Sequence, residues 1–251
     1  MPAWTYGMFV WRELSTHDVN GALRFYQQLA GWTAKRVEMP NGAYFLLHHG
    51  EKQVGGLMAL ADGVEMPPYW MSYLSVPEVD LAVDAAKRFG GEVVWGPLDV
   101  PNLGRMATVV DPRGAAISMM KATKGDPPYV GPPGTGDFCW EQLASPDLPN
   151  ARTFYGEVVG WKTIAAPTGD FETFGFGPGP GEQAATLVPA GSAGQPPGWI
   201  SFIVVESLSA ACARVIKLGG QVLTEEHVVP GAGAYAVVRD PQGAVLGLFK
   251  A

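Results

Sequence analysis

The sequence contains few charged residues, few cysteines and no long apolar run, and each shortage excludes a class of protein. Charged residues make up 16% of the 251 positions, and the formal net charge is −7. Proteins that bind nucleic acid or anionic membranes present clusters of Lys and Arg. No such cluster occurs in this sequence, so we expect neither nucleic acid nor a membrane as a partner.

Transmembrane and secretory signals are also missing. No apolar stretch reaches the roughly 18 residues that a membrane-spanning helix needs, and the first residues lack the basic and apolar regions of a secretory signal. The two cysteines, Cys139 and Cys212, are isolated in apolar patterns. This is typical of small buried residues rather than of a disulfide framework. These features predict a cytoplasmic protein.

Gly and Pro are abundant, with 33 and 22 residues respectively. They cluster in the stretch GDPPYVGPPGTG at 125–136, which is typical of a linker. Apolar residues make up 47% of the chain, enough to build a packed core. The chain is therefore predicted to fold into two domains on either side of this linker.

The two halves of the sequence repeat each other at a fixed offset. Trp11 and Trp140 lie 129 positions apart (140 − 11), and the same offset relates the DPRGA motif at Asp111 to the DPQGA motif at Asp240. Further pairs with this offset are Trp32 and Trp161, Trp70 and Trp199, Gly31 and Gly160, and Lys121 and Lys250. A constant offset along the chain indicates a duplicated module. We predict a first module at 1–124, a linker at 125–136 and a second module at 137–251.

Apolar periodicity predicts the elements of each module. Residues 19–29 have apolar side chains at helical spacing, between the capping oxygens of 15–18 and Gly31, which can end a helix in the left-handed conformation. Asp111 begins a sequence typical of a tight hairpin turn. The other elements predicted in the first module are strands at 9–14, 43–49, 53–60 and 68–76, a helix at 79–89, and a strand on each side of the turn. Each module therefore reads as βαββ followed by βαβββ, an α+β fold.

The pattern D-x-x-x-A-x-x-FY-x-x-x-x-GW, followed about eighty residues later by DPxGA and a final strand, occurs in both modules. This arrangement resembles the vicinal oxygen chelate superfamily, which includes glyoxalase I, extradiol dioxygenases, and fosfomycin and bleomycin resistance proteins. The resemblance covers almost the whole chain, twice. It implies two tandem βαβββ modules, the glyoxalase/bleomycin resistance/dioxygenase fold, whose curved mixed sheets surround a cavity.

In relatives that bind a metal, the ligands come from the first strand, the strand that opens the second half of the module, and a Glu of the last strand. In this sequence the corresponding positions are Trp11, Trp70 or Met71, and Ser118 in the first module, and Trp140, Trp199 or Ile200, and Gly247 in the second. None of these side chains is a usual metal ligand. The four histidines are scattered, so we predict no metal and no other cofactor. Elemental analysis that found about one equivalent of Ni, Zn, Mn or Fe per module would contradict this expectation.

The first strand carries the most informative polar residue. Alternation places Phe9, Trp11 and Glu13 on one face, and the resemblance implies that this face lines the cavity. A carboxylate in apolar surroundings has a raised pKa, which suits a general acid or base, so Glu13 is the candidate catalytic residue. The alternative is an ordinary buried Glu whose charge is satisfied by Arg105, by the adjacent arginine or by a backbone amide. Gln142 takes this position in the second module and cannot titrate.

Other candidate ligand-binding residues come from the strands that would line the two cavities. Aromatic rings with a few polar atoms suit a planar, mostly apolar ligand, although each of these residues could equally be part of an ordinary core. The candidates are Trp11, Tyr73, Arg105, Ser118 and Met120 in the first module and Trp140, Gln142, Phe202 and Phe249 in the second, with Tyr44, Phe174 and Tyr235 as further possibilities.

Three hypotheses about function remain. The first is a metal-independent protein that binds a small, largely apolar or aromatic molecule. The second is an enzyme, either a glyoxalase-like lyase or isomerase with Glu13 as general base or a divalent-metal enzyme with non-standard ligands. The third is a structural protein without a ligand. Because the second module can supply the partner that single-module relatives obtain by dimerising, the chain is expected to be a monomer or a homodimer.

Overall fold

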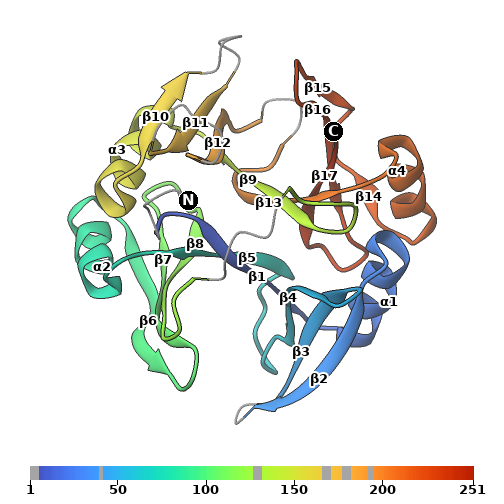
Figure 1. Ribbon diagram of the computed structural model, residues 1–251, viewed down its shortest axis with the longest axis horizontal. Coiled ribbons are helices and arrows are strands. Elements are labelled where there is room, and N and C mark those ends of the chain that lie inside the picture. Colours follow the sequence, from blue (N-terminus) through green and yellow to red (C-terminus); the bar gives the residue numbers. More distant parts are fainter. Residues whose placement is uncertain (1–5, 40–41, 127–131, 166–170, 177–181, 192–194) are drawn as a thin grey trace.

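The computed structural model describes residues 6–251 except 40–41, 127–131, 166–170, 177–181 and 192–194. Its strands form two curved, mixed sheets, one from each half of the repeat (Figure 1). The first sheet has the order β2-β3-β4-β1-β5-β8-β7-β6 and the second the order β10-β11-β12-β9-β13-β17-β16-β14, with β15 paired to β16. The predicted α+β class and the two-module fold are therefore confirmed.

The elements of the first module are β1 (Phe9–Thr16), α1 (Val19–Ala30), β2 (Thr33–Met39), β3 (Gly42–His49), β4 (Lys52–Ala59), β5 (Tyr69–Ser75), α2 (Val79–Arg88), β6 (Glu92–Val100), β7 (Gly104–Val110) and β8 (Ala116–Ala122). Those of the second are β9 (Phe138–Ser145), α3 (Leu148–Val159), β10 (Lys162–Ala165), β11 (Glu172–Gly175), β12 (Gln183–Pro189), β13 (Gly198–Val204), α4 (Leu208–Lys217), β14 (Gln221–Val222), β15 (His227–Val229), β16 (Gly233–Arg239) and β17 (Val245–Lys250).

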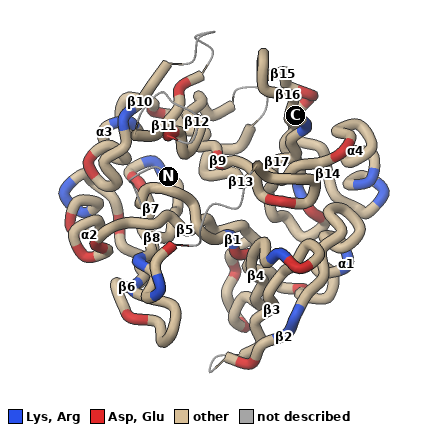
Figure 2. The backbone as a smooth tube through the Cα atoms, in the orientation of Figure 1, with Lys and Arg blue, Asp and Glu red and all other residues tan. Residues whose placement is uncertain are grey.

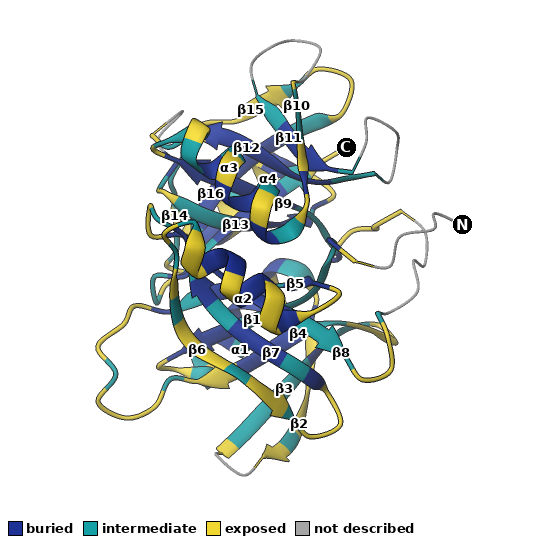
Figure 3. Ribbon diagram, turned by 90° about the vertical axis from the view of Figure 1, so that its left-hand side faces the viewer, coloured by how far each residue is buried: buried dark blue, intermediate teal, exposed yellow. Residues whose placement is uncertain are grey.

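Each module contains two units of the βαβββ type rather than the predicted βαββ and βαβββ, and the last unit of the second module also has the short strand β15. The additional strand of the first unit is β2, whose side chains are almost all exposed (Figure 3). An edge strand with little buried surface lacks the apolar alternation from which a strand can be recognised in a sequence. Within the module the two units meet at the antiparallel pair formed by β1 and β5.

The two sheets pack back to back at their central strands, and the helices lie on both flanks of this contact (Figure 1). Helix α1 packs beside α4, and α2 beside α3. Two apolar clusters result, and each contains residues of both modules. The core of the molecule is therefore shared between the modules, while the other face of each sheet points outward.

The repeated aromatic residues bond to the opposite module. The Tyr26 hydroxyl, on α1, donates to Asp240 Oδ2 at 3.0 Å, and the Tyr155 hydroxyl, on α3, donates to Asp111 Oδ2 at 3.2 Å. Each tyrosine belongs to an FY motif and each aspartate to a DPxGA motif. These motifs, which carry the family resemblance, therefore join the modules reciprocally.

The tryptophans at the helix ends also donate hydrogen bonds toward the opposite module. The Trp32 indole donates to the Gly136 carbonyl at 2.7 Å, and the Trp161 indole donates to the Gly7 carbonyl at 3.0 Å. Both carbonyls lie just before the first strand of the opposite module. The repeat thus continues in three dimensions as an approximate two-fold relation, in which each contact occurs twice.

We expect the Tyr26→Phe substitution to lower the free energy of unfolding by about 1–3 kcal/mol, because it leaves buried polar groups unpaired. The Trp70 indole, which donates to the Tyr26 hydroxyl at 2.9 Å, loses its acceptor, and Asp240 Oδ2 loses its donor. Urea denaturation measures the effect. Tyr155→Phe should have a similar cost, and the exposed Tyr6→Phe serves as the control. Equal stability of all three variants would contradict this account of the interface.

One charged pair lies at the centre of the interface. Arg12 Nε donates to Glu141 Oε1 at 2.7 Å, and Ser72 and Ser201 donate to Glu141 Oε2 at 2.9 and 2.8 Å. Glu141 is fully buried. Burial raises its pKa, and the arginine and the two hydroxyls oppose this shift. Arg12 and Glu141 stand at equivalent positions of the repeat, as do the two serines, so this cluster lies where the two-fold relation passes between the sheets.

Around the outside, segments with Lys and Arg alternate with segments with Asp and Glu, and no stripe of one sign is seen in this view (Figure 2). Among the described residues, no helix has both the length and the apolar character needed to cross a membrane.

Candidate functional site

A bulge in β1 decides which of its side chains share a face. Alternation predicts Phe9, Trp11 and Glu13 on one face, but the register with β5 shifts between Phe9 and Trp11. The extra residue turns Phe9 toward the second module, where its ring centroid lies 5.3 Å from that of Trp199. The prediction was therefore wrong for Phe9. Trp11 and Glu13 lie on the opposite side of the sheet, away from the helices.

Glu13 is held by two tyrosine hydroxyls. Tyr44, on β3, donates to Glu13 Oε2 at 2.7 Å, and Tyr73, on β5, donates to Glu13 Oε1 at 3.1 Å. The Trp11 indole in turn donates to the Tyr44 hydroxyl at 3.0 Å. Gly56 makes room for this arrangement, since a Cβ atom there would lie 1.8 Å from the Tyr44 oxygen. Donors from β3 and β5 therefore converge on one carboxylate, and Trp11 on β1 donates to one of these donors.

The electrostatic surroundings raise the pKa of Glu13. Burial is the largest cause, and the hydrogen bonds from Tyr44 and Tyr73 lower the pKa by less than burial raises it. Conversely, burial and the nearby carboxylate raise the pKa of both tyrosines, so their hydroxyls stay protonated as donors. Glu13 is thus a carboxylate that uses phenol hydroxyls, rather than a cation, to hold its charge.

The arginines that could have neutralised Glu13 are engaged elsewhere. Arg12 bonds to Glu141, and Arg105 forms ion pairs with Asp80 and Asp99. Arg105 follows the alternation of β7 onto the face that α2 covers, so the structure does not bring it together with the other predicted ligand-binding residues. Among the described residues no ion pair to Glu13 is formed.

Several methionines share the side of the sheet on which Glu13 lies. In the sheet register, Met71 lies opposite Glu13, and Met58 lies opposite its bonded tyrosine on β3. Met106 and Met120 face each other across β7 and β8. We define the Glu13 face by these and the other side chains on this side of the first sheet: Trp11, Glu13, Tyr44, Met58, Met71, Tyr73, Trp95, Leu98, Met106, Thr108, Ser118 and Met120.

The rim of the Glu13 face is open to solvent. Met58 is 37% exposed, Trp95 43% and Leu98 38%. Large apolar side chains that stay exposed around a polar centre are typical of a surface that binds something. Methionine is common on such surfaces because its unbranched, polarisable side chain adapts to different ligands.

The structure places Trp11, Glu13, Tyr73, Ser118 and Met120, five candidates from the sequence, on one face of one sheet. The other methionines and the rim were not among the candidates. A signal for them was available. All nine methionines of the chain fall within the first 120 residues, and none in the second module. This asymmetry between otherwise matching halves distinguishes the module with the apolar face.

The corresponding face of the second module is filled by its own side chains. Gln142 Nε2 donates to Gln195 Oε1 at 2.6 Å, and Gln195 Nε2 donates to the Tyr235 hydroxyl at 2.9 Å. Gln142 is 3% exposed and Gln195 2%. The Phe202 ring lies over Gly247, where a Cβ atom would be 2.1 Å from the ring. A polar network and a packed ring thus occupy the space above this sheet.

Further contacts close this second face. Phe202 and Tyr235 pack edge to face in a small apolar cluster, against which Trp140 and Phe249 also pack. The ring of His227, on β15, lies 5.0 Å from that of Tyr235. The structure therefore brings together the four predicted residues of the second module, Trp140, Gln142, Phe202 and Phe249, as an interior cluster.

The donor set of the Glu13 face does not fit the metal of the family. Trp11 and Ser118, at two of the implied ligand positions, both pair with Tyr73 in the sheet register and so lie in one row. An indole N–H only donates hydrogen bonds, and the Ser118 hydroxyl bonds to Thr108 at 2.8 Å. No group of three His, Cys, Asp or Glu side chains that could hold a metal occurs in the part of the chain that the structure describes. The absence of a metal stays a prediction.

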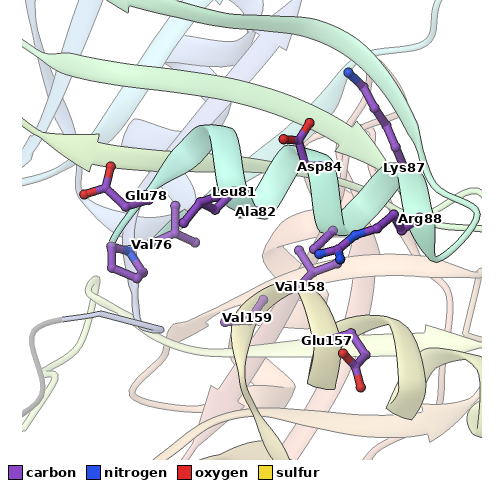
Figure 4. A pocket seen from close by; sticks show the side chains of 12 residues that line it. Val76, Glu78, Leu81, Ala82, Asp84, Lys87, Arg88, Glu157, Val158 and Val159 are labelled. Carbon is purple, nitrogen blue, oxygen red and sulfur yellow. The ribbon is translucent and has the colours of Figure 1, made fainter.

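A groove elsewhere on the molecule contains none of the predicted site residues. Its volume is about 790 Å³, and it lies between α2 and α3 (Figure 4). Leu81 and Ala82 line one side and Val158 and Val159 the other, with Glu157 nearby. It belongs to the helix-covered side of the first module, opposite to the Glu13 face.

We expect Glu13→Gln to stabilise the protein at pH 8 by about 1 kcal/mol, because it removes a carboxylate whose ionised form burial disfavours. Because the folded-state pKa of Glu13 is raised, its contribution to stability is full below the ordinary Glu pKa and is lost as the pH rises through the folded-state value. The advantage of the variant should therefore vanish toward pH 4. Urea denaturation at both pH values measures it. A variant less stable than the wild type at pH 8 would contradict the raised pKa.

This fold and this arrangement define a protein class with paired βαβββ units, and the sequence confirms the family. The sequence model of the Glyoxalase/Bleomycin resistance protein/Dioxygenase superfamily matches residues 9–119 and 140–248, so the chain belongs to this superfamily.

Particular relatives are similar along nearly their whole length. The Mycobacterium tuberculosis protein named "Putative glyoxylase CFP32" is 30% identical over 250 residues, which cover 96% of this chain and 93% of that protein. The anthracycline biosynthesis protein DnrV of Streptomyces peucetius is 29% identical over 257 residues, 95% of this chain and 91% of that protein.

Solved structures share the fold at low sequence identity. The Mn(II)-bound glyoxalase from Novosphingobium aromaticivorans superposes with a TM-score of 0.65 at 15% identity, covering 98% of this chain and 82% of that chain. The 2,3-dioxygenase LapB from Pseudomonas sp. KL28 gives a TM-score of 0.63 at 12% identity, covering 99% of this chain and 94% of that chain. These likenesses support the fold alone.

Proposed function

We propose that this protein binds a small, largely apolar or aromatic molecule on the Glu13 face, without the metal of its family. One observation carries the proposal. The two modules match along their length, yet the first leaves a half-buried carboxylate among exposed apolar side chains, while the second fills the same place with buried side chains of its own. Burial of the exposed rim by a ligand would remove apolar surface from water and stabilise the complex.

The ligand-binding residues in this proposal are those of the first module. Trp11 and Tyr73 present aromatic surface beside the carboxylate, and Met58 and Met120 present adaptable apolar surface. Trp140 and its neighbours in the second module are assigned a packing role instead. Arg105 is left out, because its guanidinium bonds to Asp80 on the other side of the sheet.

A second candidate function is a lyase or isomerase that uses Glu13 as general base. It is favoured by the raised pKa of Glu13 and by the glyoxylase and anthracycline biosynthesis names of relatives. In this reaction class, an Oε atom of Glu13 accepts a proton from a carbon next to a carbonyl group and returns it to another atom. The hydroxyls of Tyr44 and Tyr73 hold the carboxylate in position.

Native mass spectrometry tests both functions together. The purified protein is measured before and after incubation with a mixture of aldehydes, catechols and planar polyketides, beside the Glu13→Gln variant and Glu157→Gln, an exposed helix residue, as the control. A retained compound of unchanged mass supports binding. A compound of altered mass that Glu13→Gln fails to produce supports catalysis. If no compound is retained or altered by the wild type, the proposed function is wrong.

A further inference from the structure

We propose that the molecule bound on the Glu13 face is an organic cation, with a protonated amine attached to an apolar or aromatic body. This inference rests on the proposed function and adds the charge of the ligand to it.

Glu13 lacks the counter-charge that other shielded carboxylates of this protein have. The buried Glu141 bonds to Arg12, and the partly buried Glu172 bonds to Arg152. Glu13 is half-buried, like Glu172, but bonds to two neutral hydroxyls. A buried carboxylate is usually paired with a cation. Since no arginine or lysine of the described chain contacts Glu13, the ligand is the remaining source of positive charge.

The hydrogen bonds around Glu13 all run toward its carboxylate. The Trp11 indole donates to Tyr44, and Tyr44 and Tyr73 donate to Glu13, so every bond in this network ends at the carboxylate. Such a network favours the ionised carboxylate, which accepts hydrogen bonds, over the protonated acid, which would donate one. An ionised carboxylate has about four acceptor sites, and only two are used. The protonated amine of a ligand would supply N–H donors together with charge, which makes stronger hydrogen bonds than a neutral donor.

The apolar side chains on the Glu13 face indicate what the rest of the ligand is. Met71 lies opposite Glu13 in the sheet register, Met58 lies opposite Tyr44, and the exposed rim includes Trp95 and Leu98. A bare metal ion or a small hydrated cation would leave this apolar surface in water. An aromatic or aliphatic body would cover it, and an indole ring also attracts cations to its face. The second module offers no carboxylate at the equivalent position, since Gln142 is neutral and buried.

The test compares two probes that share one ring system and differ in charge. 2-Naphthylmethylamine is protonated at pH 8, and 2-naphthylmethanol is neutral. Calorimetric titration should show the amine binding the wild type at least about tenfold more tightly than the alcohol, as expected for a charge-assisted hydrogen bond. Glu13→Gln should remove this preference, whereas Glu157→Gln, which changes the net charge equally, should keep it.

The outcomes separate this inference from the proposed function. A wild type without preference for the amine overturns the inference, as does a preference that survives in Glu13→Gln. In either case, binding of the neutral apolar dye N-phenyl-1-naphthylamine, competed by the naphthyl alcohol, shows whether the Glu13 face binds apolar molecules at all. If it does, only the charge of the ligand was wrong. If it does not, the proposed function fails as well.

Discussion

Replacing Arg12 with methionine is expected to lower the free energy of unfolding by about 3–5 kcal/mol, because it leaves a fully buried carboxylate without its cation. Glu141 is 0% exposed, and its remaining partners are the hydroxyls of Ser72 and Ser201. Two neutral donors cannot replace the charge of a guanidinium at 2.7 Å. The loss should be largest at neutral pH and smaller in acid, since protonation of Glu141 removes the unpaired charge.

Urea denaturation of Arg12→Met and of the double variant Arg12→Met, Glu141→Met measures this effect. The double variant removes both charges, so it should recover most of the lost stability. If Arg12→Met lowers the free energy of unfolding by less than about 1 kcal/mol, water reaches Glu141 and the pair behaves as an exposed one.

The position of this pair explains why the modules differ here. Arg12 and Glu141 occupy equivalent positions, so an unaltered repeat would bring two like charges into contact at the interface. Like charges at this distance repel strongly where water is excluded. The substitution of one charge by its opposite makes each module complementary to the other module and not to a copy of itself.

Replacing Gln142 with glutamate is expected to lower the free energy of unfolding by about 3 kcal/mol at pH 8, because a carboxylate would be buried without a cation. Gln142 is 3% exposed, and its amide nitrogen donates to Gln195. A carboxylate has no hydrogen to donate and would face an acceptor oxygen. Burial would raise its folded-state pKa, so the variant should approach wild-type stability as the pH falls below the ordinary Glu pKa.

Glu13→Gln is the reciprocal exchange and the control for this experiment. It should change stability in the opposite direction at pH 8, although the two substitutions occur at equivalent positions of the repeat. Denaturation of both variants at pH 4 and pH 8 checks the contrast. Wild-type stability of Gln142→Glu at pH 8 would mean that the second face is hydrated, which contradicts its assignment as a filled interior.

The ends of the helices were predictable because they depend on neighbouring residues. Asp18 accepts the Gly21 amide at the start of α1, and Gly31 ends this helix with φ of 73°. The turn at Asp111 closes with the bond from the Gly114 amide to its carbonyl. These conformations follow from local hydrogen bonding and from the freedom of glycine.

The partners of Glu13 were not predictable in the same way. Alternation along β1 could not reveal the bulge after Phe9, because the bulge depends on the register with β5. Arg105 was a reasonable partner by residue type, but α2 places Asp80 beside it. Tyr44 reaches Glu13 across β4, the strand between β3 and β1, over a glycine whose role is visible only in three dimensions.

The sequence by itself determined the duplicated module, the order of most elements and the family, because repeated residues and local backbone preferences are recorded in the chain directly. Only the tertiary structure decided which module fills the outer face of its sheet with its own side chains. That difference depends on side chains far apart in the sequence, such as Gln142, Gln195 and Tyr235, which meet and fill one face. In the other module, Tyr44 and Tyr73 meet at Glu13, on the face of the sheet whose rim includes the exposed Met58.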